Sequence, residues 1–318
     1  MALFLKIIAV SSILLFYGCD TSETTKQKSR SKDQAHINKE TPSEATSNSR
    51  MLSQQFKEYW FSGTAELTSY QLSIERYGEL REGTAMTIFV TEDFLPNIQV
   101  KANRSNDTTM PVLKVNKTKN FLTGIYPYSI MSSTFSPLTQ EQHAIKISTS
   151  VQEWCGQTYM QLNNRDQYEI ITHSYFEGEA DQEKTLPKTW LENEFWNRIR
   201  INPEELPTGD ITVIPAFDFT RMYHKELKAY KAFAALRQGD SITNFTINYS
   251  ELQRQLSISF NNKFPYEIER WEETNGINPN DTTRLKTTAI KMKRIKTPYW
   301  QQNSNKDIVL RDSLNLKS

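Results

Sequence analysis

The chain has 318 residues, of which 38 are Lys or Arg and 37 are Asp or Glu, so its formal net charge is +1. Because positively and negatively charged residues are interspersed along the chain, the sequence lacks the clustered basic face that nucleic-acid binding requires. We therefore expect no nucleic-acid partner. Its two cysteines, Cys19 and Cys155, are too few for a metal site built on cysteine clusters. We expect neither a metal ion nor a cofactor.

The first residues are typical of an export signal. Lys6 is followed by an apolar run over residues 7–17 and then by Gly18 and Cys19. A basic start, an apolar stretch and a small residue before the cleavage site together predict a signal peptide over residues 1–18. A transmembrane anchor is the alternative, but a span needs about 18 to 20 apolar residues, and this run is shorter.

Cys19 decides how the chain would be held after cleavage. A cysteine directly behind the cleavage site resembles the lipobox of bacterial lipoproteins, although Phe16 and Tyr17 stand where that motif usually has Leu and a small residue. The resemblance implies that Cys19 carries a diacylglycerol and fatty acyl groups such as palmitate, with the lipid bilayer as a partner. An ordinary signal peptide followed by an unrelated cysteine is the alternative. We expect a membrane-anchored protein of the bacterial cell envelope, with the choice between inner and outer membrane open.

The residues behind Cys19 differ sharply from the rest of the chain. Residues 20–50 are rich in Ser, Thr, Lys, Glu, Gln and Asn and nearly devoid of apolar side chains. Such a segment cannot bury enough surface to offset the entropy of ordering it, so residues 19–50 are predicted to form a disordered tether. As a random coil, a tether of about thirty residues spans on the order of 30 Å. Residues 51–318 are long enough for a sizeable core and predict one large β-rich envelope domain.

Alternating apolar residues predict that most of this domain is sheet. In the stretch 64–74, Tyr70, Leu72 and Ile74 recur at every second position, which is the pattern of a half-buried strand. Turn-forming residues separate such runs at 77–79 and at 163–166. Further strands are predicted over residues 80–90, 112–118, 124–132, 144–150, 158–162, 168–175, 211–214, 225–233, 242–249, 253–260, 266–271 and 285–295.

Two helices are predicted. Residues 53–60 place Phe56, Tyr59 and Trp60 on one side of a short helix. Residues 187–199 begin with a proline suited to a first turn and carry an apolar stripe at helical spacing. The fold class is therefore mainly β: a curved antiparallel sheet, an open barrel or a sandwich, with one or two short helices.

Several strings of the sequence resemble a family of uncharacterised bacterial envelope lipoproteins. They include IFVTEDF, TGIYPYSIMSSTFSPL, STSVQEWCGQTYMQLNNR and LPTGDI, and the likeness covers residues 56–230. Some members carry the label septum formation inhibitor Maf, which implies a nucleotide pyrophosphatase with a Ser-Pro-Arg-Arg signature. In this chain Ser136 and Pro137 are followed by Leu138 instead of arginine. The arginines of the signature are thus absent, and a pyrophosphatase ranks only as the third functional alternative.

One group of polar residues could support catalysis. His173, Glu177, Glu179 and Asp181 share one face if residues 173–181 continue a strand. They could collect oxygens around a hard cation or hold a general base. The alternative is a solvated acidic strand end.

Cys155 is the second catalytic candidate. It lies in a Trp-Cys-Gly string, and His143 is the histidine near it in sequence that could serve as its base. A nucleophilic thiol needs such a base and usually a helix N-terminus. The surroundings instead predict a strand, in which a buried cysteine acts as a small hydrophobe.

No stretch of the sequence is a strong active-site motif. Aromatic clusters at 126–128, 175–176 and 217–219 could line a concave cleft for an acyl chain, a glycan or a peptide, or could pack in the core. We therefore predict a membrane-tethered envelope lipoprotein of non-enzymatic binding or assembly type, with a hydrophobic ligand or an envelope protein as its partner. The alternative is an envelope hydrolase that uses Cys155 or the group around His173.

Overall fold

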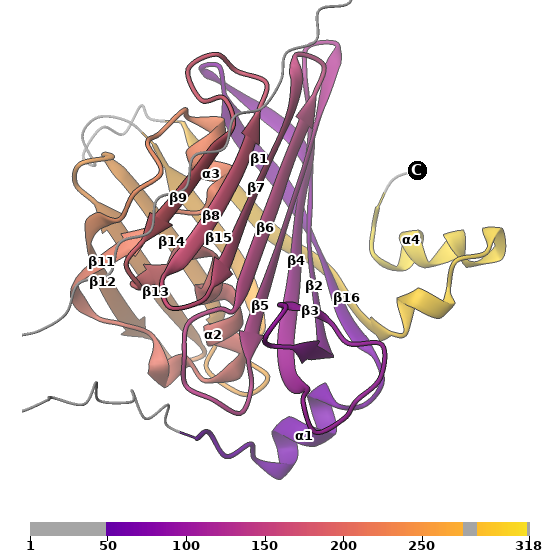
Figure 1. Cartoon of the computed structure of the whole chain (residues 1–318). Coiled ribbons are helices and arrows are strands. Elements are labelled where there is room, and N and C mark those ends of the chain that lie inside the picture. Colours follow the sequence, from indigo (N-terminus) through magenta and orange to yellow (C-terminus); the bar gives the residue numbers. More distant parts are fainter. Residues whose placement is uncertain (1–48, 276–284, 317–318) are drawn as a thin grey trace, which may run out of the picture. The chain divides into compact units, whose positions relative to one another are not determined.

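A computed structural model of the chain describes residues 49–275 and 285–316. The predicted signal peptide, the lipidation site at Cys19 and nearly all of the predicted tether lie outside these residues. The described residues belong to one compact unit, and the fold described below is that of this unit (Figure 1).

The unit is built on a single sheet whose strands lie side by side mainly in chain order. The sheet has 16 strands in the order β10-β11-β12-β13-β14-β15-β16-β1-β2-β4-β5-β6-β7-β8-β9, with β3 paired to β2. Neighbouring strands are antiparallel except β10 and β11, which are parallel. The strands are β1 (Ala65–Arg76), β2 (Glu79–Leu95), β3 (Val100–Lys101), β4 (Met110–Thr123), β5 (Tyr126–Pro137), β6 (Lys146–Glu153), β7 (Gly156–Asn164), β8 (Tyr168–Ser174), β9 (Gln182–Leu186), β10 (Trp190–Leu191), β11 (Gly209–Ile214), β12 (Tyr230–Gln238), β13 (Ile242–Tyr249), β14 (Arg254–Asn261), β15 (Ile268–Thr274) and β16 (Lys286–Thr297). The predicted mainly β class, with an open antiparallel sheet and few short helices, is confirmed.

Four of the connections between neighbouring strands lie at the same end of the sheet. Antiparallel neighbours reverse direction at every strand, so the turns β1–β2, β4–β5, β6–β7 and β8–β9 must all lie on one side. We call this side the turn end. The described chain begins at the opposite end, where Ser49 forms a bridge with Gln140 in the loop between β5 and β6.

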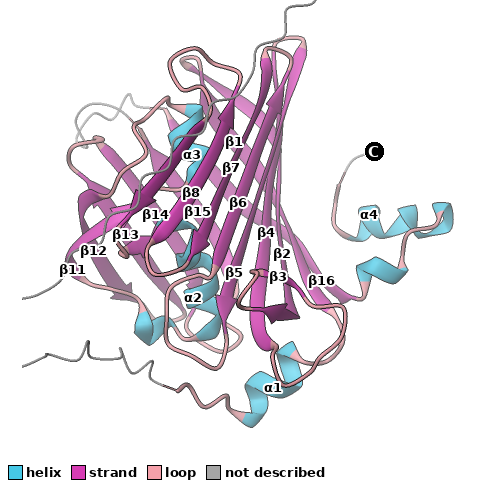
Figure 2. Ribbon diagram, in the orientation of Figure 1, coloured by secondary structure: helices cyan, strands magenta, loops and turns pink. Residues whose placement is uncertain are grey.

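The helices are short (Figure 2). They are α1 (Gln54–Trp60), α2 (Phe195–Ile201), α3 (Phe217–Met222) and α4 (Leu310–Ser313), with single 3-10 turns η1 (Glu192–Glu194), η2 (Pro203–Glu205), η3 (Tyr299–Gln301) and η4 (Asn305–Val309). Helix α1 was predicted, and Ser53 begins it by accepting a hydrogen bond from the Phe56 N–H at 3.1 Å.

Helix α2 lies on the concave side of the curved sheet. Its Trp196 ring meets the Trp271 ring of β15 at 5.0 Å, while the side-chain amide of Asn197 donates to the Leu113 carbonyl of β4 at 3.0 Å. Strands β4 and β15 are separated in the sheet by β2, β1 and β16, so a helix that contacts both must lie inside the curve. Figure 1 shows the strands bending around α2 and α3.

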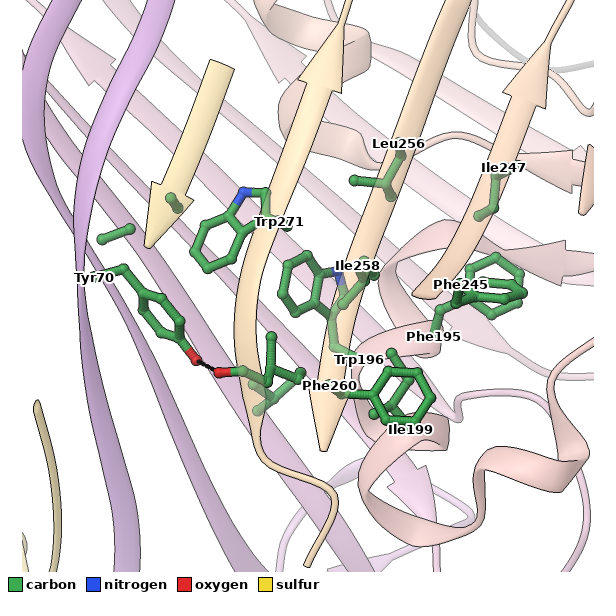
Figure 3. Close-up of a cluster of buried hydrophobic side chains, with 14 of the residues drawn as sticks. Tyr70, Phe195, Trp196, Ile199, Phe245, Ile247, Leu256, Ile258, Phe260 and Trp271 are labelled. Carbon is green, nitrogen blue, oxygen red and sulfur yellow. Dashed lines mark hydrogen bonds between the residues drawn. The ribbon is translucent and has the colours of Figure 1, made fainter. Parts of the chain in front are cut away.

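Aromatic and aliphatic side chains fill the space around α2 (Figure 3). Phe195 meets Phe245 at 5.1 Å, and Tyr70 meets Trp271 at 4.7 Å. The Tyr70 hydroxyl is buried but donates to the Ile268 carbonyl at 2.9 Å, as a buried tyrosine requires. The concave face is therefore the protein core, packed by the chain's own helices.

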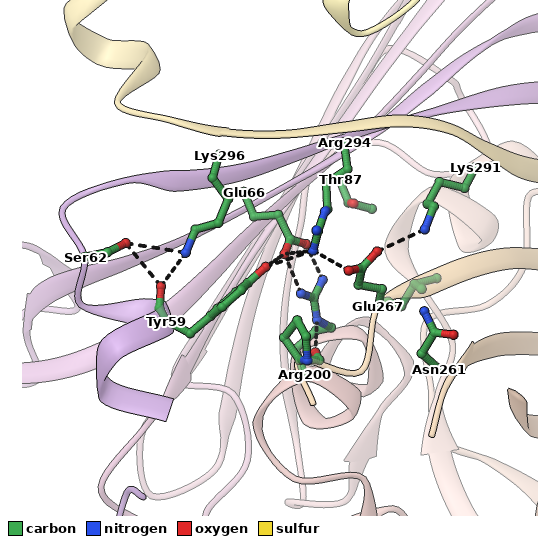
Figure 4. A network of polar contacts seen from close by, with 12 residues as sticks. Tyr59, Ser62, Glu66, Thr87, Arg200, Asn261, Glu267, Lys291, Arg294 and Lys296 are labelled. Atoms are coloured by element: carbon green, nitrogen blue, oxygen red, sulfur yellow. Dashed lines mark hydrogen bonds and ion pairs between the residues drawn. The ribbon is translucent and has the colours of Figure 1, made fainter. Parts of the chain in front are cut away.

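Buried ion pairs fasten α2 and its neighbours to the sheet. Arg200 of α2 binds both carboxylate oxygens of Glu66 on β1, at 2.5 and 2.7 Å (Figure 4). Arg254 of β14 binds Glu192 of η1 at 2.5 Å. Lys119 of β4 binds Asp218 of α3 at 3.0 Å.

The helix predicted over 187–199 is wrong in its first half. Trp190 and Leu191 instead pair with Val213 and Ile214 of β11, and α2 begins only at Phe195. Tertiary pairing overrides the local helical spacing there. Helix α3 was not predicted at all, and the strand predicted over 225–233 is displaced, because β12 spans Tyr230–Gln238.

Candidate functional site

A cavity of about 370 Å³ opens beside the last strands of the sheet. One wall comes from β7, β8, β9 and the loop behind β8, and the other comes from residues 220–227, which include the end of α3. These two walls belong to the two end regions of the open sheet, so we call this cavity the seam pocket. Its volume lies at the small end of the range of known ligand sites.

Glu179 organises the polar side of the seam pocket. One carboxylate oxygen lies 2.7 Å from Nδ1 of His224, and the other accepts from the Ser174 hydroxyl at 2.6 Å. Nε of Arg221 lies 3.9 Å from the same carboxylate. Glu179 and His224 are 45 positions apart in sequence, so this contact joins two distant parts of the chain.

Arg221 is held by stacking rather than by hydrogen bonds. Its guanidinium carbon lies 3.9 Å from the centroid of the Phe176 ring, and its side chain is only 4% exposed. Its Nε has no hydrogen-bond partner in the described residues. Burial lowers the pKa of the Arg221 guanidinium, although the charge of Glu179 opposes this.

The predicted group around His173 is only partly assembled. Strand β8 ends at Ser174, so residues 175–181 form a loop and do not share a strand face; Ala180 in it has a φ of 51°. His173 lies 3.4 Å from Asp181, whereas Glu179 turns toward His224. Glu177 is exposed and does not line the seam pocket. The common face, which required residues 173–181 to continue a strand, is therefore not formed.

Cys155 lies on the exposed turn between β6 and β7, so the expectation of a buried strand cysteine is also wrong. Its N–H donates to the Glu153 carboxylate at 2.7 Å. A hydrogen bond to Glu153 and the charge of that residue raise the pKa of the Cys155 thiol, which disfavours the thiolate. His143 precedes β6 while Cys155 follows it, and His143 binds Glu194 at 2.8 Å instead.

The seam pocket offers acid–base and ion-pairing groups. Across residues 49–275 and 285–316, no three His, Cys, Asp or Glu side chains come together as metal ligands. The contact between Glu179 and His224 can orient an imidazole, because a carboxylate on Nδ1 fixes which nitrogen faces outward. His224 and Arg221 were missed in the sequence, since neither belongs to a motif and both are placed by α3.

The turn end also exposes a row of large apolar side chains. Ile125 is 83% exposed, Tyr175 72% and Trp154 67%. Each comes from a different turn, and further exposed apolar residues of these turns extend the row. We call this set the apolar rim: Tyr77, Leu80, Leu122, Ile125, Trp154 and Tyr175.

Ring contacts make the apolar rim continuous from turn to turn. The Tyr77 hydroxyl lies 2.9 Å from that of Tyr128, and Tyr126 joins Tyr128 to Trp154 at ring distances of 5.9 and 6.2 Å. Tyr175 packs directly over the next turn. A methyl group at Gly156 would lie only 2.7 Å from its ring.

Carboxylates dominate the polar residues of the same turns. Arg81 forms an ion pair with Glu79, which leaves the other acids in excess. These other acids are Glu82, Glu153, Glu177 and Asp181. The apolar rim therefore has an acidic surround.

No protein-family model matches the chain, and no curated protein or solved structure shows a significant similarity to it. Membership of the envelope lipoprotein family accordingly stays a prediction. None of the helices in the described part of the chain is sufficiently long and apolar to pass through a bilayer.

Proposed function

We propose that the chain is a membrane-tethered envelope lipoprotein that binds a partner protein through its apolar rim. The single observation that carries the proposal is the exposure of large apolar side chains on four neighbouring turns. Lone exposed apolar residues are ordinary, but a contiguous row of them is characteristic of interaction surfaces. Tyr and Trp are also the side chains that most often dominate binding energy.

The core packing favours the rim over the concave face as the binding surface. Phe217 and Phe219, which were candidates to line a cleft, are buried in α3. Trp196 and Trp271 pack against each other in the same interior. A hydrophobic ligand on the concave face would have to displace this core, whereas the apolar rim already faces solvent.

The charge around the rim indicates what kind of partner fits. An excess of carboxylates on the turns attracts a surface that combines apolar residues with Lys or Arg. Such pairs contribute mainly to association rate and specificity and are screened by salt. We therefore propose an envelope protein with an apolar and basic contact surface.

Site-specific photo-crosslinking tests the proposal. A photoreactive residue at position 125, introduced into the full-length chain in its native host, should give one discrete adduct with an envelope protein. The combined change Ile125→Ser, Trp154→Ser and Tyr175→Ser, with the crosslinker moved to position 122, should lower the yield at least about tenfold. Because these side chains are exposed, folding should be unaffected.

A matched control uses exposed apolar residues of the C-terminal segment. Trp300→Ser, Ile308→Ser and Val309→Ser also remove three solvent-facing apolar side chains, and this variant should retain the adduct. Equal adduct yield from the rim variant, or equal loss in the control, would refute the rim as the binding surface.

A hydrolase remains the second proposal, supported by the contact between Glu179 and His224 inside a cavity. If the chain is a hydrolase, His224 is the general base and Glu179 orients the imidazole of His224. A screen with ester, amide and glycoside substrates should find an activity that both His224→Gln and Glu179→Gln abolish. Activity that survives both changes argues against it.

A further inference from the structure

Two lysines in the wall of the seam pocket are not engaged in ion pairs. Lys184 of β9 and Lys225 behind α3 both line the cavity. Lys184 is half-buried and Lys225 is exposed, and neither has an acidic partner among the described residues. Their ammonium groups are therefore available to a ligand.

Arg221 adds a third cation whose charge is incompletely matched. Its nearest carboxylate oxygen lies 3.9 Å away, beyond hydrogen-bond distance, and its buried Nε is unpartnered within the described part of the chain. Stacking on Phe176 fixes the plane of the guanidinium. A planar, fixed guanidinium is suited to bind carboxylate or phosphate oxygens in pairs.

The acids that line the cavity are already engaged. Glu179 has His224 and Ser174 as partners, at 2.7 and 2.6 Å. Glu226 lies 3.4 Å from Lys228, which is nearer to Glu251, at 2.9 Å. The wall carries Arg221, Lys184 and Lys225 against the two carboxylates of Glu179 and Glu226, so its net charge is positive.

We propose that the seam pocket is a binding site for a small hydroxylated organic anion, with a phosphate or carboxylate group held by Arg221, Lys184 and Lys225. The remaining wall supports a hydroxylated body, because Thr158, Thr172 and Gln182 offer hydroxyl and amide groups. The lowered pKa of Arg221 agrees with a buried cation that an anion would stabilise. The seam pocket and the apolar rim share the loop of residues 175–181, but none of the three proposed anion ligands belongs to the rim, so either proposal can fail alone.

Isothermal titration calorimetry of the full-length chain in a non-ionic detergent tests the site. The probes are inorganic phosphate, glycerol 3-phosphate, citrate and gluconate, with glycerol as the neutral control. We expect saturable binding of at least one anion and none of glycerol. A comparison of the affinities for glycerol 3-phosphate and gluconate then distinguishes a phosphate site from a carboxylate site.

Three variants decide which residues bind. Arg221→Met should weaken the best probe about 10- to 100-fold, as expected for a lost charged hydrogen bond. Lys184→Met combined with Lys225→Met should also weaken it, and this pair decides the matter if Arg221→Met fails to fold. Arg270→Met removes an exposed cation on β15 and should leave binding unchanged. Absence of saturable anion binding, equal binding of glycerol, or unchanged affinity in the lysine variant would overturn the proposal.

Discussion

Replacing Arg200 with Met should destabilise the fold more than any surface change of the same kind. Arg200 is 2% exposed and its partner Glu66 is completely buried. Its Nε also donates to the Pro265 carbonyl at 2.8 Å, so one side chain joins α2 both to β1 and to the loop between β14 and β15. Met keeps most of the volume and leaves Glu66 buried without its main counter-charge.

The expected loss follows from that unpaired charge. Breaking one partner of a buried ion pair costs about 3 to 5 kcal/mol. For a domain of this size each kcal/mol shifts the melting temperature by about 2 to 4 °C, which gives a fall of about 6 to 20 °C. The matched control is Arg165→Met, which breaks an exposed pair with Glu169 and should cost under about 1 kcal/mol.

The pH dependence gives the sharper test. In the native protein burial alone would raise the pKa of Glu66, but Arg200, together with Tyr59 and Arg294, outweighs burial and lowers the pKa. Without Arg200 the burial effect should dominate and raise the pKa of Glu66 above its unfolded value. Protonated Glu66 then contributes stability at low pH, and this contribution is lost as pH rises through the pKa of Glu66 in the folded protein.

Urea unfolding of Arg200→Met and of the double variant Arg200→Met with Glu66→Gln, at pH 5 and pH 7, measures this effect. The double variant should be the more stable of the two at pH 7 and the difference should shrink at pH 5. A loss below about 1 kcal/mol in Arg200→Met, or a difference that grows at pH 5, would refute the reasoning.

Three further outcomes can be measured on the same protein. Burial lowers the pKa of Lys117 to about 8, so the protonated lysine destabilises the fold below that pH. Although Lys117 contacts the Trp196 ring at 3.8 Å, Lys117→Met should raise the free energy of unfolding at pH 7 by about 1 to 3 kcal/mol, measured by urea unfolding. Burial alone would raise the pKa of Glu273, but neighbouring cations lower it to about 2. About 3 kcal/mol of stability should therefore be lost as pH falls from about 5 to 2, and Glu273→Gln should flatten that part of an acid-unfolding curve. Gly156→Ala should push the Tyr175 ring off the turn between β6 and β7, because the new methyl would lie 2.7 Å from the ring. The crosslinking yield at the rim should then fall, in the same direction as in the triple rim variant.

The long strands could be predicted because their signal is local. Tyr70, Leu72 and Ile74 alternate in the sequence and are all buried on β1. The turn at Tyr77 and Gly78 likewise joins β1 to β2 as predicted, and both residues have a positive φ there. Side chains that alternate between two faces reveal a strand without knowledge of its partners.

The segment on the concave face could not be predicted in this way. Glu192, Glu194, Arg198 and Arg200 resemble the solvent side of an amphipathic helix, yet all four are buried. Arg198 has the nearby Glu194 as a partner, but Arg200 is matched by Glu66, 134 positions away in sequence. No local pattern contains that pairing.

The candidate site was foreseen only in its general region. The sequence drew attention to Glu179 but paired it with neighbours along a presumed strand. Of its actual partners, Arg221 belongs to α3, a helix of only six residues without a distinctive pattern, and His224 lies just beyond the end of that helix. The exposure of Trp154 and Tyr175 was equally invisible, because buried and exposed aromatic residues look alike in one sequence.

The pairing of β1 with β16 has a consequence for how the polypeptide acquires its shape. Ser69 lies opposite Lys293, 224 positions later, so the middle of the sheet is joined by nearly the first and the last strands to be synthesised. Contacts between residues so far apart in sequence form slowly during folding. A nascent or truncated product that ends before residue 286 would present β1 as a long bare edge, which invites intermolecular pairing. Loss of the C-terminal strand should therefore yield aggregates rather than a smaller native protein.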